Sequence, residues 1–215
     1  MVARADALIE SLSDRKTKVM ELLRGEMAIT NWDMIKDASL IVDLEGKITS
    51  NNLLNTFMGS TRPILEQFSE DLVAIRTKVT MIVSKLTEEE DESMFYNDYS
   101  GEDSVAMKFV TIIQVIQSMA DWSSAVFDNW INYHNNRAVL KTGIDVLSLL
   151  KDKDYCKKDD MCQSLMMLDC KMAKELKSIL NTTLFHYVTL EDIVLDATGS
   201  VMDTPQTPGY SRLYV

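Results

Sequence analysis

The residue types that most often perform chemistry are few in this 215-residue chain. It has two histidines, His134 and His186, and three cysteines, Cys156, Cys162 and Cys170. The cysteines lack the Cys-x-x-Cys spacing of zinc sites, and neither histidine lies near them in the sequence, so we expect no metal site. An odd number of cysteines, and an N-terminus without the apolar core of a signal peptide, indicate a reducing compartment, cytoplasmic or nuclear.

Known catalytic patterns are also missing. A di-iron helical bundle would need Glu-x-x-His pairs, but Ile131 and Thr183 stand three residues before the histidines. There is no phosphate-binding glycine loop, no His-Glu-x-x-His motif and no nucleophile elbow. Glu191 and Asp192 are adjacent, so on a helix they cannot converge on one substrate atom. We therefore expect no enzyme and no cofactor. An unrecognised enzyme would need a pocket of convergent polar groups, which the sequence does not reveal.

The C-terminal residues 205–215 form a polar arm with a bulky apolar tip. Pro205 and Pro208 prevent this arm from forming a helix, and the chain finishes with Leu213, Tyr214 and Val215. One interpretation is a frayed terminus. The other is a docking peptide whose carboxylate and last side chains enter a pocket on a partner.

Composition narrows the class of partner. Hydrophobic residues make up 46% and charged residues 26% of the chain, which is typical of a globular protein. The net charge of −11 disfavours binding to nucleic acid or to anionic membranes. No apolar run reaches membrane-spanning length. We therefore expect no nucleic-acid partner and no membrane partner.

Apolar residues recur at three- and four-residue steps between sparse glycines and prolines, which predicts four long helices. The expected spans are 5–44, 61–87, 104–150 and 154–198. Gly25 is expected to mark a bend in the first span, Pro63 to lie in the first turn of the second, and Gly199 to end the fourth. The predicted fold is all-α: an up-down four-helix bundle over residues 1–204, with a flexible tail at 205–215. The long apolar faces also suggest assembly side by side.

Residues 87–104 form the longest loop expected within the bundle. The loop is acidic, contains three aromatic side chains, and ends in Gly101, Glu102, Asp103 and Ser104. It is either a passive acidic connector or a functional loop, because loops longer than about a dozen residues are often functional.

From about residue 62 onward, the chain resembles the REG (11S) family of ATP-independent proteasome activators. The matching runs read RPILEQ (62–67), SVAM (104–107), DY (154–155) and YVTLEDI (187–193). In that family the subunits are four-helix bundles assembled as heptameric rings. The resemblance implies a homo-oligomeric ring that binds the α-ring of the proteasome core particle and uses no ATP.

The resemblance also implies roles for both candidate sites. The tail Leu213-Tyr214-Val215 would insert between core subunits, its carboxylate seeking a lysine and Tyr214 fixing the register. The loop at Gly101, Glu102, Asp103 and Ser104 would open the gate, and the core would hydrolyse the peptides.

The chain departs from the family pattern at two places, and a second interpretation of its function stays open. The loop reads Ser-Gly-Glu-Asp-Ser at 100–104, where family loops usually read Asp-Gly-Asn-Asn-Phe-Gly, and Val215 ends the chain where many members end in tyrosine. The alternative is a non-catalytic helical adaptor whose Leu213-x-Val215 ending binds a PDZ-type groove by strand addition. A ring would favour the activator, and a monomer or dimer would favour the adaptor.

Overall fold

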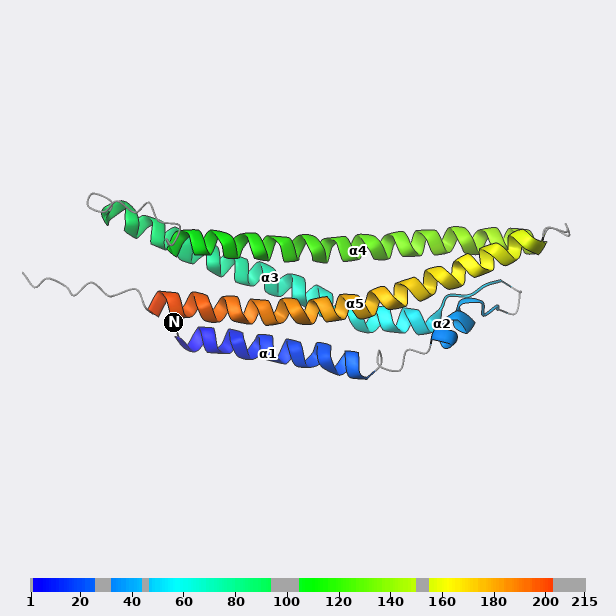
Figure 1. The fold of residues 1–215 in the computed structure, drawn as a ribbon, viewed down its shortest axis with the longest axis horizontal. Helices are drawn as coiled ribbons and strands as arrows, with labels where there is room; N and C mark the ends of the chain where they lie inside the picture. Colours follow the sequence, from blue (N-terminus) through cyan, green and yellow to red (C-terminus); the bar gives the residue numbers. More distant parts are fainter. Residues whose placement is uncertain (1, 26–31, 44–46, 94–104, 150–154, 203–215) are drawn as a thin grey trace, which may run out of the picture.

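The computed structural model describes residues 2–25, 32–43, 47–93, 105–149 and 155–202. These residues are all-α, as predicted. Five helices account for nearly all of them: α1 (Val2–Arg24), α2 (Trp32–Ser39), α3 (Asn52–Ser93), α4 (Val105–Leu149) and α5 (Tyr155–Met202) (Figure 1). Outside the helices, the described backbone forms one isolated antiparallel bridge between Val42 and Ile48. No helix in the described part of the chain is long and apolar enough to cross a membrane.

The four long helices lie along one axis of an elongated molecule (Figure 1). α3 and α5 run in one direction, and α1 and α4 run in the other. α5 contacts each of the other four helices, whereas α1 packs mainly against α5 and only slightly against α3. The short helix α2 packs against α5 near the start of α3.

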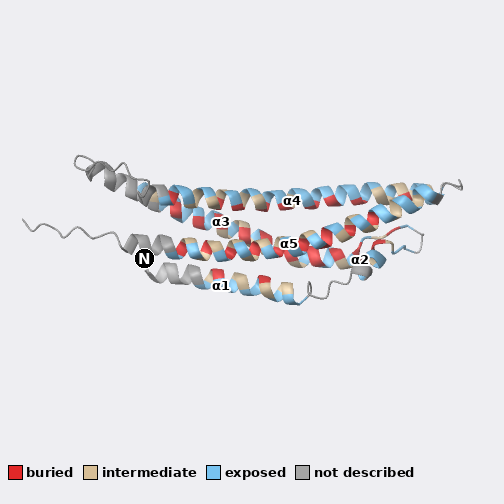
Figure 2. Ribbon diagram, viewed as in Figure 1, coloured by how far each residue is buried: buried red, intermediate tan, exposed pale blue. Residues whose placement is uncertain are grey.

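The apolar periodicity of the sequence explains this packing. On α3 the buried residues Leu65, Phe68, Leu72, Ile75 and Val79 follow one another at steps of three or four, which places them on one face of the helix. Similar buried stripes on the other long helices meet them in one extended core, shown in red in Figure 2. A second, smaller core cluster lies where the bridge segment meets α4 and α5.

The predicted start of the second helix is wrong. α3 begins nine residues before Thr61, at Asn52. The Asn51 side chain caps the helix by accepting a hydrogen bond from the Leu54 N–H at 3.1 Å. Thr61 is not a cap, because its hydroxyl donates to the Phe57 carbonyl at 2.8 Å within the helix. Pro63 therefore lies inside α3, where burial of the apolar residues on both sides outweighs the loss of one backbone hydrogen bond.

The first predicted helix is two helices. α1 ends at Arg24, and the Gly25 N–H donates to the Glu21 carbonyl at 2.8 Å, so Gly25 marks the end of this helix rather than a bend. After α2, the described residues 40–43 and 47–51 are irregular apart from the Val42–Ile48 bridge. A continuous apolar stripe thus did not guarantee a continuous helix.

Two other predicted helix ends fall too early. α3 continues through the acidic run to Ser93, because glutamate is a good helix former and the unfavourable helix dipole costs only about 0.3–1 kcal/mol. Residues 87–93 of the predicted loop are therefore helical, and the rest of it, 94–104, lies outside the described residues. α5 continues past Gly199 to Met202, since one glycine costs a helix only about 1 kcal/mol. The bounds of α4 and the start of α5 agree with the prediction to within one residue.

Candidate functional site

Both sites predicted from the sequence lie outside the described residues: the tail Leu213, Tyr214 and Val215, and the loop Gly101, Glu102, Asp103 and Ser104. The structure does place the helix ends that lead into them. α3 ends, α4 begins and α5 ends at the same end of the molecule, at the left of Figure 1. The two segments therefore leave the helices from one end, as the alternating directions of α3, α4 and α5 require.

A buried polar cluster that sequence reasoning missed lies toward the other end of the helices. We call it the Asp169 cluster; its members are Ser39 on α2, Asn51 at the cap of α3, Tyr133 and Arg137 on α4, and Asp169 on α5. Asp169 and Ser39 are fully buried, and Arg137 is 8% exposed. The cluster therefore joins four helices through polar groups that are removed from water.

Each carboxylate oxygen of Asp169 accepts several hydrogen bonds. Oδ1 accepts from the Tyr133 hydroxyl at 2.9 Å and from Arg137 Nε at 3.0 Å. Oδ2 accepts from Asn51 Nδ2 at 3.0 Å and from Arg137 Nη2 at 3.3 Å. A buried carboxylate is tolerated when its lone pairs are used in this way and its charge is paired.

Arg137 and Asn51 extend the cluster to the backbone of the irregular segment. Arg137 donates to the carbonyls of Thr49 at 3.2 Å and Ser39 at 3.4 Å. Asn51 Nδ2 also lies 3.1 Å from the Ile35 carbonyl and 3.2 Å from Ser39 Oγ. These contacts hold residues 47–51 against α4 and α5, although those residues have little regular structure of their own.

The arrangement of the Asp169 cluster is that of an anchor, not of a catalytic site. Burial, reinforced by the Asp169 charge, raises the pKa of Tyr133 well above its ordinary value, so its hydroxyl remains a proton donor. Every oxygen of Asp169 is occupied by a donor from the protein itself. No position is left at which a substrate atom could meet the carboxylate.

A partly buried carboxylate ties α1 to α3 and α5. Asp71 on α3 accepts from the Tyr187 hydroxyl at 3.0 Å and from Gln67 Nε2 at 3.1 Å, and lies 3.5 Å from Arg15 Nε. Burial, followed by the Asp71 charge, raises the pKa of Tyr187 well above its usual range. Lys16 on α1 pairs nearby with Glu191 on α5.

The two histidines have different environments. His134 is exposed on α4, with its ring beside that of Tyr133. His186 on α5 packs instead among aromatic rings, stacked on Phe68 with centroids 5.7 Å apart and edge-on to Trp122 at 4.9 Å. Burial lowers the pKa of His186. His186 therefore has a packing role in the described structure.

The cysteines form no recognisable site. Cys156 is exposed, and Cys162 and Cys170 are partly buried along α5. Burial raises the pKa of the Cys162 thiol, which disfavours the reactive thiolate. Within the described ranges, no group of three or more His, Cys, Asp or Glu side chains could hold a metal ion.

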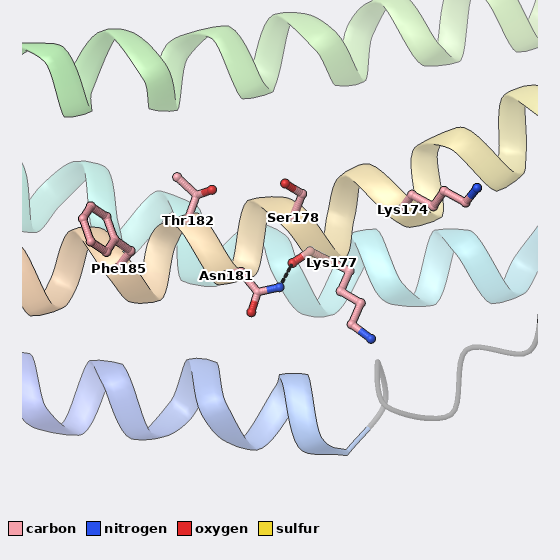
Figure 3. Close-up of a pocket in the computed structure, with 6 residues that line it drawn as sticks. All are labelled: Lys174, Lys177, Ser178, Asn181, Thr182 and Phe185. Atoms are coloured by element: carbon pink, nitrogen blue, oxygen red, sulfur yellow. Dashed lines mark hydrogen bonds between the residues drawn. The ribbon is translucent and has the colours of Figure 1, made fainter.

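The outward face of α5 carries a shallow groove of about 470 Å³. Figure 3 shows the six side chains that line it, on the near side of α5 between α1 and α4: Lys174, Lys177, Ser178, Asn181, Thr182 and Phe185. Asn181 donates to the carbonyl of Lys177 at 2.9 Å, and Phe185 is 66% exposed. All six residues come from one helix, so the groove lacks the convergent groups of an active site.

One signal in the sequence could have revealed the Asp169 cluster. Asp169 occupies the apolar stripe of α5, between the buried residues Leu165 and Met172, where an acid has no place unless it is paired. Arg137 likewise follows Tyr133 by four residues on the buried face of α4. Two opposite charges on the apolar faces of neighbouring helices predict a buried ion pair.

No protein-family model matches the chain, and no curated protein matches it.

Proposed function

We propose that this protein is a non-catalytic, ATP-independent activator of the proteasome core particle, of the kind formed by the REG (11S) family. In this proposal α1, α3, α4 and α5 are the up-down four-helix bundle of one subunit. A homo-oligomeric ring, heptameric as in the family, binds the α-ring of the core particle in the cytoplasm or nucleus. The tail supplies affinity, and the loop between α3 and α4 opens the gate.

The observation that carries the proposal is the placement of three helix ends. α3 ends and α4 begins at the end of the molecule where α5 also ends (Figure 1). An activator needs its docking tail and its gate loop on the same face, because both must reach one surface of the core particle. The shared end of these three helix termini supports the proposal.

The exposed apolar side chains support side-by-side assembly. Val73 on α3, Val139 on α4 and Met167 on α5 are each about two-thirds exposed or more, at 67%, 69% and 73%. These residues lie on three different helices, so apolar surface is available to a second copy on more than one side. A contact between two different faces either closes into a ring or continues as a filament.

Affinity in such a ring would come from the number of tails. A single tripeptide tail binds weakly, but tails linked in one ring act at high effective concentration. Removal of the last three residues should therefore abolish binding even though it removes only a small contact per subunit.

The experiment combines light scattering with a peptidase assay. The full chain should form a closed oligomer and stimulate hydrolysis of a fluorogenic peptide by closed core particles. Deletion of residues 213–215 should abolish binding while helicity and oligomer mass stay unchanged, and a Ser211→Ala variant should behave as the full chain does. Stimulation that survives the deletion would refute the tail's role. A monodisperse monomer that binds a PDZ-type domain would favour the adaptor.

The loop has its own test. Glu102→Lys or Asp103→Lys should give rings that bind the core but fail to stimulate it, and that compete with the unmodified protein. Normal stimulation by these variants would remove the gate role from these residues, whereas joint loss of binding and stimulation would make the loop part of the docking surface.

A further inference from the structure

His186 is a titratable side chain at a junction of three helices. Its ring stacks on Phe68 of α3 with an interplanar angle of 11° and meets Trp122 of α4 edge-on at 69°. Phe68 also meets Trp122 and Tyr187 edge-on, with centroids 6.1 and 5.2 Å apart. The imidazole thus serves as one ring of an aromatic cluster that fastens α5 to α3 and α4.

Both ring nitrogens of His186 are buried and have no hydrogen-bond partner among the described residues. A neutral imidazole carries one N–H donor and one acceptor, whereas the protonated ring carries two donors and a positive charge. The face of Phe68 attracts a cation, but a ring contact does not replace the water hydrogen bonds that both N–H groups lose on burial. The packed arrangement therefore favours the neutral ring.

Acidic side chains on the parts of α3, α4 and α5 near this cluster have other partners in the described structure: Asp71 of α3 pairs with Tyr187 and Arg15, Asp121 of α4 with Gln117, and Glu191 of α5 with Lys16 of α1. Burial is accordingly the cause of the lowered pKa of His186, with no contribution from a charged neighbour.

We propose that His186 makes the junction of α3, α4 and α5 acid-labile, so that protonation of its ring loosens the C-terminal half of α5 from the other two helices. This inference is independent of the proposed function. If the activator proposal also holds, the loosened part of α5 is the part that leads to the docking tail.

The direction of the pH effect follows from the linkage between proton binding by His186 and opening of the junction. A histidine in the unfolded chain titrates near pH 6.5, and His186 in the folded protein titrates lower. As pH falls below about 6.5, the open state takes up the proton first, so the junction weakens. The opening equilibrium constant rises by up to tenfold per pH unit and levels off below the folded pKa of His186.

The chain offers a matched control, since its only other histidine is the exposed His134. In the His134→Gln variant one imidazole remains, and its NMR titration reports His186 alone. We expect a midpoint clearly below 6.5 and, at pH 5.5, faster amide hydrogen exchange in residues 180–194 than at pH 7.5. Residues 160–172, which are outside the aromatic cluster, should change much less.

Urea unfolding of His186→Phe completes the test. Between pH 6.5 and 5.5 the unfolding equilibrium constant of the wild type and of His134→Gln should rise several-fold, by at most about fivefold, more than that of His186→Phe. An equal pH dependence in all three proteins would overturn the proposal, as would a His186 midpoint at or above 6.5. If His186→Phe fails to fold, the titration and exchange measurements on His134→Gln still decide the matter.

Discussion

Replacing Asp169 with asparagine should destabilise the protein more than any conservative change elsewhere on α5. The substitution keeps the size and shape of the side chain but removes its charge. One of the two oxygens becomes an NH₂ group, which then faces a donor: Tyr133 and Arg137 on one side, or Asn51 and Arg137 on the other. The Arg137 guanidinium, 8% exposed, is left without its counter-charge.

The expected loss of stability follows from the charge of Arg137, which is left without a partner. Breaking a buried ion pair by removing one partner costs about 3–5 kcal/mol, because the remaining charge stays out of water. Domains of ordinary stability have about 5–15 kcal/mol in total, so Asp169→Asn should remove roughly a fifth or more of it. With a urea slope of about 3 kcal/mol per molar, the unfolding midpoint should fall by about 1–2 M.

The assay is urea unfolding followed by circular dichroism at 222 nm. The matched control lies six residues further along α5, at Glu175, which forms a pair with the exposed Lys171 one turn earlier at 3.6 Å. Glu175→Gln should change stability by less than about 0.5 kcal/mol, because water already screens that pair. Both variants neutralise one acidic side chain on the same helix. The difference between their losses of stability therefore reports the effect of burying the ion pair.

A shift below about 0.5 M for Asp169→Asn would refute the reasoning, since it would mean that water or another acceptor reaches Arg137. The double variant Asp169→Leu with Arg137→Met provides a further check. It leaves no unpaired charge, so it should recover most of the stability that Asp169→Asn loses. If the double variant were less stable than Asp169→Asn, the loss could not be assigned to the orphaned guanidinium.

The remaining predictions use the same unfolding measurement. Asn51→Ala should cost about 2–4 kcal/mol, because it removes the α3 cap and a donor to Asp169 together. Tyr133→Phe should cost about 1.5–3 kcal/mol through the lost hydrogen bond to a charged acceptor. Gly59→Ala should stabilise by about 0.5–1 kcal/mol, since the added Cβ meets nothing within 4 Å on the exposed side of α3. Stability should fall as pH rises above about 10: Tyr133 and Tyr187 have raised pKa values, so the unfolded chain releases their protons first.

The sequence predicts the all-α fold class and the alternating directions of the long helices, because apolar periodicity and chain reversal are local properties of the sequence. α4 and the start of α5 agree with the prediction to within one residue. The errors occur where local signals compete with packing. Thr61 and Pro63 look like a helix start, but burial of Leu54 and Phe57 extends α3 backward through them.

The Asp169 cluster could not be derived from any single segment. Its members come from α2, the cap of α3, α4 and α5, and they meet only when the fold is complete. Neither Arg137 nor Asp169 was predicted from the sequence to belong to a site. A charge on an apolar stripe indicates that a partner exists, but the partner's identity depends on how the helices align.

The Asp169 cluster and the helix ends used in the proposed function are physically related. Long helices with repetitive apolar stripes can pack in several registers, each one turn or about 5.4 Å from the next, at similar apolar burial. A buried ion pair with several defined hydrogen bonds is satisfied in only one of those registers. Asp169 on α5 and Arg137 on α4 thereby fix where these two helices lie along one another. α5 continues for 33 further residues from Asp169 to Met202, which is roughly 50 Å at 1.5 Å per residue. The same contact therefore sets the position, along the helix axes, at which α5 ends relative to the start of α4.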